Sequence, residues 1–277
     1  MDHLLAGDAV IATMERQPSL ETDGILDSLL RLPNDTAARQ ALRTANIALT
    51  RRSIRESVTP DAQLIHAITA VEELDKSINS AAKRVRAWYA LHDPELEHRI
   101  ADHATFINAL LDQPARSADT MGGSTTPLVL AHARAVNSLI AHRTALAEGI
   151  DAAMTQVAPN IKRVAGAMIG AKLIAIAGSL ERLAIMPAGT IQLLGAETAL
   201  FRHLRNPAAR PPKHGVIFNH QAIQHARPQD RGKIARTLAD AIAIAARVDR
   251  FKGSFVGDDL ARRVERRSAE IGRRSSA

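Results

Sequence analysis

The chain has 277 residues, a formal net charge of +7, 3% aromatic residues and no cysteine. The absence of cysteine excludes disulfides, thiolate metal ligands and cysteine nucleophiles. Few aromatic side chains beside abundant Ala, Leu and Ile favour helices packed through small aliphatic groups over a sandwich or barrel of strands. We therefore predict an all-α protein, long enough for one large core or two modest ones.

The excess of positive charge is confined to the C-terminal part of the chain. Residues 202–277 contain 17 Lys and Arg against 7 Asp and Glu, or +10, so residues 1–201 contain 19 against 22, or −3. Such asymmetry is typical of phosphate binding, because each neutralised phosphate releases condensed counterions. A solvated basic tail with no ligand is the alternative interpretation.

The first 58 residues predict only short helical segments. Weak helical patterns are separated by Pro18 and Pro33 and lie at 8–16, 24–32 and 36–51. The N-terminus has no basic stretch before an apolar run, so we expect no signal peptide. The most apolar window of the chain, 164–180, contains Lys172 and falls short of the ~20 apolar residues that a membrane-spanning helix needs. We expect no membrane segment.

A long helix is predicted to begin at Pro60. Its apolar side chains repeat at the heptad spacing of a coiled coil, and they are Leu64, Ile68, Val71, Ile78, Ala82, Val85 and Tyr89. Asp75 interrupts this seam, and it either fixes the register or lies solvated at the flank of the helix. We expect a shorter helix over 95–111 and then a loop rich in Gly and Pro over 113–127.

Helical periodicity resumes at Leu128 and continues to Val157. Two long seams joined through a turn predict an antiparallel, coiled-coil-like arm over residues 59–158. A monomeric arm needs only one packed face. A second, exposed apolar face would therefore indicate that two copies pair.

The segment 159–205 is predicted to form a compact hairpin of two helices. Gly166, Gly170 and Gly178 would let helix backbones approach closely, and Pro187 ends the first helix because it has no N–H donor. The second helix changes from apolar to cationic within two turns. We expect its C-terminal end to contact an anion.

The last part of the chain alternates between basic and apolar segments. Residues 206–215 predict an exposed, Pro-rich basic loop, and 216–218 a short apolar insert in the core. A strong helix is predicted from Asp230, as its capping residue, to Arg247. Cations in its first turns oppose the helix dipole, which suggests an external anion. The tail 258–274 is predicted to be a charged helix. A face exposed to solvent would account for its arginines.

Motifs of catalysis are incomplete in this sequence. Gly166-x-x-x-Gly170-x-Lys172 is not a P-loop, which needs adjacent Gly and Lys followed by Ser or Thr after a strand. No Gly-x-Gly-x-x-Gly follows a strand, so no nucleotide or methyl-donor site is indicated. The histidines within 92–103 do not have the spacing of metal ligands on one helix face. We predict a protein that is not an enzyme and that holds no metal and no cofactor.

Three segments resemble one known family. They are GAMIGAKLIAIAGSLERLAIMPAGTIQLLGAETALFR at 166–202, PPKHG at 211–215 and RGKIARTLADAIAIAARVD at 231–249. Together they are similar to the Nop domain, the RNA-binding core of box C/D ribonucleoprotein scaffolds and of a related spliceosomal factor. RVRAWYALHDPEL at 84–96 resembles a further family signature, with Ala87 where an acid is usual. We expect its Trp and Tyr to pack rather than stack on bases.

The resemblance implies three parts: a reduced N-terminal module at 1–58, the coiled-coil arm at 59–158 and a Nop RNA- and protein-binding domain at 159–277. It implies a non-catalytic scaffold that binds kink-turn RNA of the box C/D type together with a small, ribosomal-like kink-turn-binding protein. That scaffold would position fibrillarin for RNA-guided ribose 2′-O-methylation, and its arm would form a homodimer. Its place would be the cytoplasm of an archaeon, or the nucleolus of a eukaryote.

Two alternatives remain open at this point. The chain could be a helical protein-interaction or dimerisation module whose basic face is incidental, or a Nop-domain paralogue with no role in methylation. The RNA-binding residues that the resemblance and the charge pattern indicate are Glu197, Thr198, Arg202, Arg205, Lys213, His214, Asn219, His220, Arg231, Lys233 and Arg236. We expect Phe201 to pack in the core. For His220, base stacking and a polar surface position are equally open.

Overall fold

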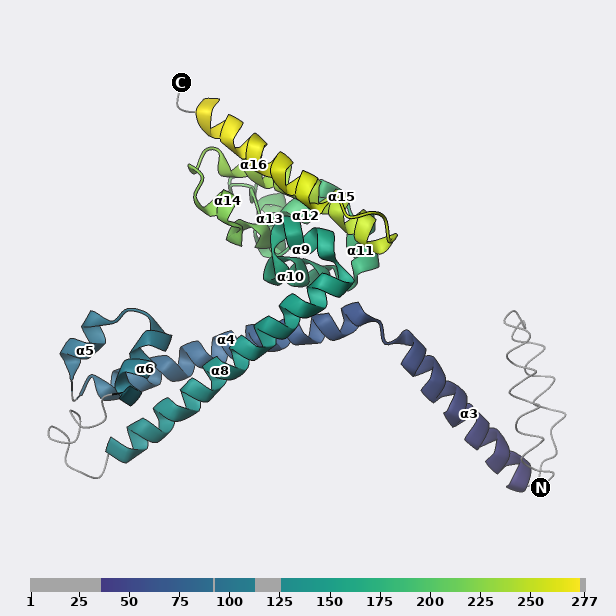
Figure 1. Ribbon diagram of the computed structural model, residues 1–277, viewed down its shortest axis with the longest axis horizontal. Coiled ribbons are helices and arrows are strands. Elements are labelled where there is room, and N and C mark those ends of the chain that lie inside the picture. Colours follow the sequence, from purple (N-terminus) through teal and green to yellow (C-terminus); the bar gives the residue numbers. More distant parts are fainter. Residues whose placement is uncertain (1–35, 92, 113–125, 275–277) are drawn as a thin grey trace. The chain divides into compact units, whose positions relative to one another are not determined.

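The computed structural model describes residues 36–91, 93–112 and 126–274 (Figure 1). The chain divides into two compact units, Met1–Thr59 and Pro60–Ala277. The described residues of both units form helices, turns and loops without a strand. The prediction of an all-α protein is confirmed.

In the first unit the structure describes one long helix, α3 (Thr36–Ser57). It extends beyond the helix expected at 36–51. Almost all of its described side chains are exposed, and Ala45 is its one described buried residue. The helices expected at 8–16 and 24–32 lie outside the described residues.

The second unit contains the arm, which is formed by α4 (Pro60–Tyr89) and α8 (Thr126–Val157). The two helices run antiparallel and pack along their length (Figure 1). The heptad prediction for α4 is confirmed, because its buried side chains include Leu64, Ile68, Val71, Ala82, Val85 and Tyr89. Asp75 is exposed and its carboxylate lies 3.0 Å from Nε of Arg143 on α8. The interruption of the seam is therefore an interhelical ion pair at the flank of the arm.

At one end of the arm, two short helices replace the single helix expected over 95–111. They are α5 (Pro94–Arg99) and α6 (His103–Asp112). The helix breaks at Ile100, which is extended (φ −113°, ψ 104°). A new helix then starts because the Asp102 carboxylate accepts hydrogen bonds from both N–H and O–H of Thr105 at 2.8 Å. These bonds also lower the pKa of Asp102.

The end of the arm has a small core of its own. Phe106, Ile107 and Leu110 of α6 pack with buried residues of α4 and α8. Tyr89 belongs to this cluster and meets the ring of Phe106 edge to face, with centroids 6.0 Å apart. Trp88 packs against the same cluster. Both aromatic residues of the 84–96 signature are thus packing residues, as expected.

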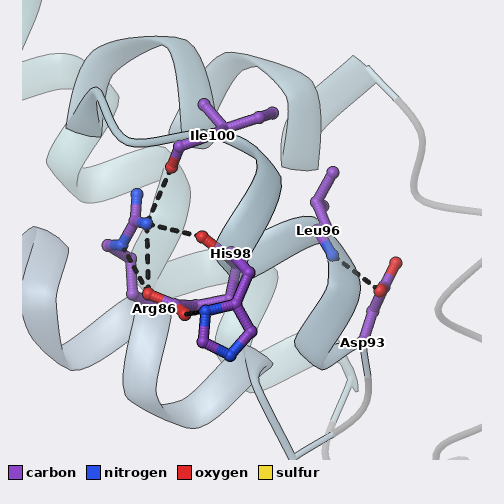
Figure 2. A network of polar contacts seen from close by, with 6 residues as sticks. Arg86, Asp93, Leu96, His98 and Ile100 are labelled. Atoms are coloured by element: carbon purple, nitrogen blue, oxygen red, sulfur yellow. Dashed lines mark hydrogen bonds and ion pairs between the residues drawn. The ribbon is translucent and has the colours of Figure 1, made fainter.

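A nearly buried arginine ties α5 to the arm (Figure 2). Nη2 of Arg86 donates to the backbone carbonyls of Glu97 and Ile100, each at 2.7 Å. Nε of Arg86 donates to the carboxylate of Glu97 at 3.1 Å, and the guanidinium lies 4.6 Å from the ring centroid of Phe106. Nearby, the carboxylate of Asp93 caps α5 by accepting from the N–H of Leu96. One side chain of α4 therefore satisfies three acceptors at α5 and the residue that follows it.

Replacing Arg86 by Met should destabilise the end of the arm. The change leaves two backbone carbonyls and a half-buried carboxylate without their donor, at a cost of about 2–4 kcal/mol. Urea unfolding followed by circular dichroism measures this loss. Arg84→Met, at an exposed position of the same helix, is the matched control. Equal stability of the two variants would show that the Arg86 contacts contribute nothing.

The hairpin predicted over 159–205 is wrong in its detail. This segment forms five short helices, and they are α9 (Pro159–Ala165), α10 (Ala167–Ala177), α11 (Leu180–Ile185), α12 (Ala188–Leu193) and α13 (Glu197–Arg205). Gly166 and Gly178 have φ of +84° and +89° and end helices instead of lying within one. Gly170 alone has the expected role, since a Cβ there would lie 2.6 Å from Cε of Met154.

After α13 the chain forms η1 (Val216–Asn219), α14 (Gln221–Gln224), α15 (Arg231–Arg250) and α16 (Gly257–Arg274). Val216 and Ile217 are buried, which confirms the apolar insert. Asp230 occupies the N-cap position of α15, but its side chain makes no cap hydrogen bond, in contrast to the prediction. The charged helix expected at 258–274 is present as α16.

α15 lies at the centre of the helical body. Its buried residues cover more than half of the helix circumference, and most are alanine: Ile234, Ala235, Leu238, Ala239, Ala241, Ile242, Ala243, Ala245 and Ala246. Small side chains let α9, α11, α12 and α16 pack against it. The same core includes Leu64 of α4 and Ile150 of α8, so the arm enters the body instead of being linked to it by a flexible segment. A division of function at residue 158 stays a prediction.

A half-buried carboxylate joins the end of α15 to the start of α9. Asp249 accepts hydrogen bonds from the N–H of Asn160 at 3.1 Å, from its side-chain amide at 2.7 Å and from the N–H of Ile161 at 2.9 Å. The side-chain oxygen of Asn160 in turn accepts from the N–H of Val256. Burial raises the pKa of Asp249, and the hydrogen bonds from α9 oppose that shift. These contacts fix the turn from α15 into α16.

Candidate nucleic-acid interface

Two segments on either side of the predicted basic loop cross each other closely. The N–H groups of Gly215 and Val216 donate to the carbonyls of Gln192 and Leu194, both at 2.8 Å. The side-chain amide of Gln192 is buried and donates to the carbonyl of Lys213 at 2.6 Å. The crossing therefore places the start of α13 and the end of the basic loop together.

Glycine is required at both sides of this crossing. A Cβ at Gly215 would lie 1.9 Å from the carbonyl oxygen of Leu194, which is shorter than any real contact. Gly195 has φ of +82°, and a Cβ there would lie 2.5 Å from a methyl group of Val216. The first contact is with backbone, so no side-chain movement relieves it.

Gly215→Ala should destabilise the protein by at least about 2–3 kcal/mol, at the upper end of the cost of overpacking. Gly189→Ala is the matched control, because nothing lies within 4 Å of a Cβ at that position in α12. It should be neutral or slightly stabilising, since Ala favours a helix over Gly. Urea denaturation measures both. A Gly215→Ala protein as stable as the control would contradict the close crossing.

The helix that follows the crossing, α13, carries four of the predicted RNA-binding residues and has none of its residues buried. Arg202 and Arg205 are exposed, and no described residue forms an ion pair with either. Thr198 is exposed in the first turn. Glu197 is also exposed, but its carboxylate accepts the N–H of Gly195 at 2.7 Å and so supports the turn into the helix.

Phe201 does not pack in the core, in contrast to the expectation. It is 57% exposed, and Leu204 on the same helix is 66% exposed. The apolar side of α13 lacks a neighbouring helix in the described structure that would cover these side chains. α13 thus presents apolar and cationic side chains together at the surface.

Three side chains meet around the ring of Phe218 at the end of the basic loop. The ring of His214 is stacked on Phe218, with centroids 4.6 Å apart and planes 16° apart. The guanidinium of Arg231 lies 5.5 Å from the centroid of the Phe218 ring. Arg231 also donates to the carbonyls of Ala226 and Gln224, at 3.0 and 3.2 Å. Its hydrogen bonds therefore hold the 214–231 region together.

His220 is half-buried and supports local structure. Nδ1 of its ring accepts the N–H of Ala222 and so caps α14. Burial lowers the pKa of His220, although a hydrogen bond with the backbone of Val164 opposes the shift. Burial also lowers the pKa of His214, with a further contribution from the charges of Arg231 and Lys213. Both shifts favour the neutral form of the ring in the folded protein.

This arrangement predicts a loss of stability in acid. A depressed histidine pKa stabilises the fold fully above the unfolded-state pKa, near 6.5, and that contribution disappears as the pH falls through the lower folded pKa. Protonation of His220 also removes the acceptor that caps α14. His220→Asn keeps a capping oxygen without titrating, so its melting temperature should fall less between pH 7 and pH 5 than that of the native chain. Parallel pH profiles of the two proteins would contradict this role.

The remaining predicted residues lie on or beside α15. Lys233 and Arg236 are exposed and line one side of a groove between α15 and α16. The side chain of Lys213 lies next to Gly232 at the start of α15, so the loop and the helix bring three predicted cations together. Asn219 is exposed at the end of η1. No contact in the structure tests the assignment of these residues to RNA, and it stays a prediction.

Sequence reasoning missed the other side of this groove. Arg263, Arg266 and Arg267 of α16 line it, although a solvated face had been expected to account for them. The signal was their spacing, since residues three and four apart share one helix face. The described residues hold no group of three or more His, Cys, Asp or Glu placed to bind a metal ion. Among the described helices, none combines the length and apolar character required to cross a bilayer.

An arm fused to a helical body that exposes clustered cations defines a helical protein suited to holding a polyanion. The sequence model of the Nop family, described as snoRNA binding domain, fibrillarin, matches residues 70–121 and 115–270. The chain belongs to the Nop family.

Several known proteins are similar to this chain. An uncharacterized NOP5 family protein of Methanocaldococcus jannaschii is 36% identical over an alignment of 264 residues, and the match covers 85% of this chain and 63% of that protein. Nucleolar protein 56 of Homo sapiens is 35% identical over an alignment of 241 residues, and the match covers 75% of this chain and 40% of the relative. Nucleolar protein 58 of Candida glabrata is 34% identical, over 76% of this chain and 47% of the relative. This chain thus spans less than two thirds of the length of these curated relatives.

A similar fold is found among solved structures. One chain of the crystal structure of a fibrillarin/Nop5p complex matches with a TM-score of 0.53 and 26% sequence identity. The match covers 84% of this chain and 79% of that one. It therefore extends over most of the elements described above.

Proposed function

We propose that this protein is the non-catalytic scaffold of a box C/D guide ribonucleoprotein. The observation that carries the proposal is the character of α13, which exposes Arg202 and Arg205 without described ion-pair partners, beside two exposed apolar side chains. A surface helix of this kind suits a partner that offers both phosphates and apolar groups. Membership of a family described as snoRNA binding domain supports RNA as the source of those phosphates.

The partner that fits α13 is a kink-turn RNA already bound by a small kink-turn-binding protein. In this proposal Arg202 and Arg205 contact phosphates, while Phe201 and Leu204 contact the small protein. Structured RNA is recognised largely through its shape and its backbone, so neither component alone offers the full surface. The scaffold binds the composite and not the free RNA.

The other parts of the chain have separate roles in this proposal. The N-terminal module, residues 1–58, docks fibrillarin for ribose 2′-O-methylation, and the arm over 59–158 pairs two copies. The solved fibrillarin/Nop5p complex that resembles this chain supports the first role. The Nop domain over 159–277 binds the RNA. A chain of archaeal type would work in the cytoplasm, and a eukaryotic one in the nucleolus.

Fluorescence anisotropy with a labelled kink-turn RNA tests the proposal. The native chain should bind RNA tightly only when the small kink-turn-binding protein is present. Arg202→Ala with Arg205→Ala should weaken that binding by about 10- to 100-fold. The slope of log affinity against log salt should also decrease by about two, because two phosphates would no longer be neutralised.

The matched control removes two charges from the arm, through Lys83→Ala with Arg84→Ala at exposed positions of α4. It should bind like the native chain. If both double variants bound the RNA complex equally weakly, the effect would be one of net charge alone, and the proposed role of Arg202 and Arg205 would be contradicted. Methyl transfer to RNA by this chain without added fibrillarin would contradict a non-catalytic scaffold.

A further inference from the structure

The groove between α15 and α16 has an unusual concentration of cations. It has a volume of about 590 Å³. Lys233 and Arg236 line it from α15, and Arg263, Arg266 and Arg267 line it from α16. Two acids, Asp240 and Glu270, also line it. Five cations against two acids give the groove an excess charge of +3.

The acids of the molecule neutralise only part of this charge. Arg267 pairs with Glu270 at 2.8 Å, and Lys233 lies 3.8 Å from the buried carboxylate of Asp230. No described residue forms an ion pair with Arg236, Arg263 or Arg266. Like charges gathered in one groove repel each other. An anion that enters the groove would relieve that repulsion.

The cations are placed in two facing rows. Arg266 and Arg267 follow Arg263 by three and four residues, so the three exposed arginines lie on one side of α16. This side borders the apolar face of α16 that packs into the core, and α16 lies against α15 (Figure 1). Lys213 lies next to Gly232, just beyond the α15 row, and extends it towards the basic loop. A ligand with several negative charges in a line matches this arrangement better than a small single anion does.

Nucleic acid fits the groove better than an acidic protein segment. Protein partners are held by aromatic or aliphatic side chains at the centre of the contact, but the one large apolar residue of the lining, Ile271, is buried. Four of the five cations are arginines, whose planar guanidinium forms paired hydrogen bonds with phosphate. Protein–nucleic acid interfaces are also much more positively charged than protein–protein interfaces.

We propose that the groove between α15 and α16 binds the phosphodiester backbone of RNA, as a second contact separate from that of α13. The inference rests on the proposed function and assigns to α16 a direct role in it. Arg263 and Arg266 each contact a phosphate from one side, while Lys233 and Arg236 contact the strand from the other. The binding is independent of sequence, because the groove reads only the backbone.

The test compares three full-length proteins. The groove variant is Arg263→Ala with Arg266→Ala, and the matched control is Arg262→Ala with Arg273→Ala, which removes the same charge from exposed positions of the same helix outside the groove. Each is titrated at several salt concentrations with kink-turn RNA bound to its small protein. The groove variant should bind about 10- to 30-fold more weakly at 0.1 M salt than the control, with a salt slope reduced by about 1.4–1.8.

Two further probes separate the outcomes. Failure of the native chain to bind the kink-turn complex would overturn the proposed function but not the inference about the groove. In that case a plain 20-base-pair RNA duplex tests the groove. The groove variant should then lose affinity for the duplex while the control keeps it. Equal affinities of groove variant and control for both RNAs would overturn the inference. So would a selective loss of polyglutamate binding with RNA binding unchanged, because it would assign the groove to an acidic protein.

Discussion

The candidate interface depends on one close approach of backbone to backbone. Gly215 lies against the carbonyl of Leu194 at a distance that excludes a Cβ atom, and the hydrogen bonds of the crossing hold the two segments in register. α13 starts directly after one segment, and the basic loop ends in the other. The positions of Arg202 and of Lys213 are therefore fixed by the same contact, although they belong to different elements. Below the crossing, the alanine-rich helix α15 lets its neighbours pack closely enough to support it.

The parts of the fold that could be predicted from the sequence are those set by a regular repeat. The heptad spacing of α4 identified its buried face, and the charged periodicity of 258–274 identified α16. The hairpin over 159–205 could not be predicted correctly, because glycine has two roles that look identical in a sequence. Gly170 permits close packing inside a helix, whereas Gly166 and Gly178 end helices through a positive φ. Only the three-dimensional neighbours of each residue distinguish the two.

For the candidate site, too, some features could be predicted from the sequence and others could not. Charge asymmetry predicted an anion-binding surface in the C-terminal part of the chain. In the structure Lys213 lies next to Gly232, which lines the same groove as Lys233 and Arg236. The sequence could not show that the arginine side chain at 231 is engaged by two backbone carbonyls, or that His220 caps a helix. Those contacts join residues across a loop and a turn of irregular conformation. Nor could it show that α16 completes a groove with α15, since residues 233 and 263 meet only through tertiary packing.

Because α13 buries none of its residues, the stability of the helical body places little restriction on which side chains that helix carries. Its start is held by the crossing, while its outward side chains are free to diverge. The recognition proposed for residues 198–205 could therefore change in evolution without a compensating change in the core. For the same reason, the sequence of α13 could be replaced by that of a relative, and the binding selectivity of this protein would then change to that of the relative while the core stayed intact.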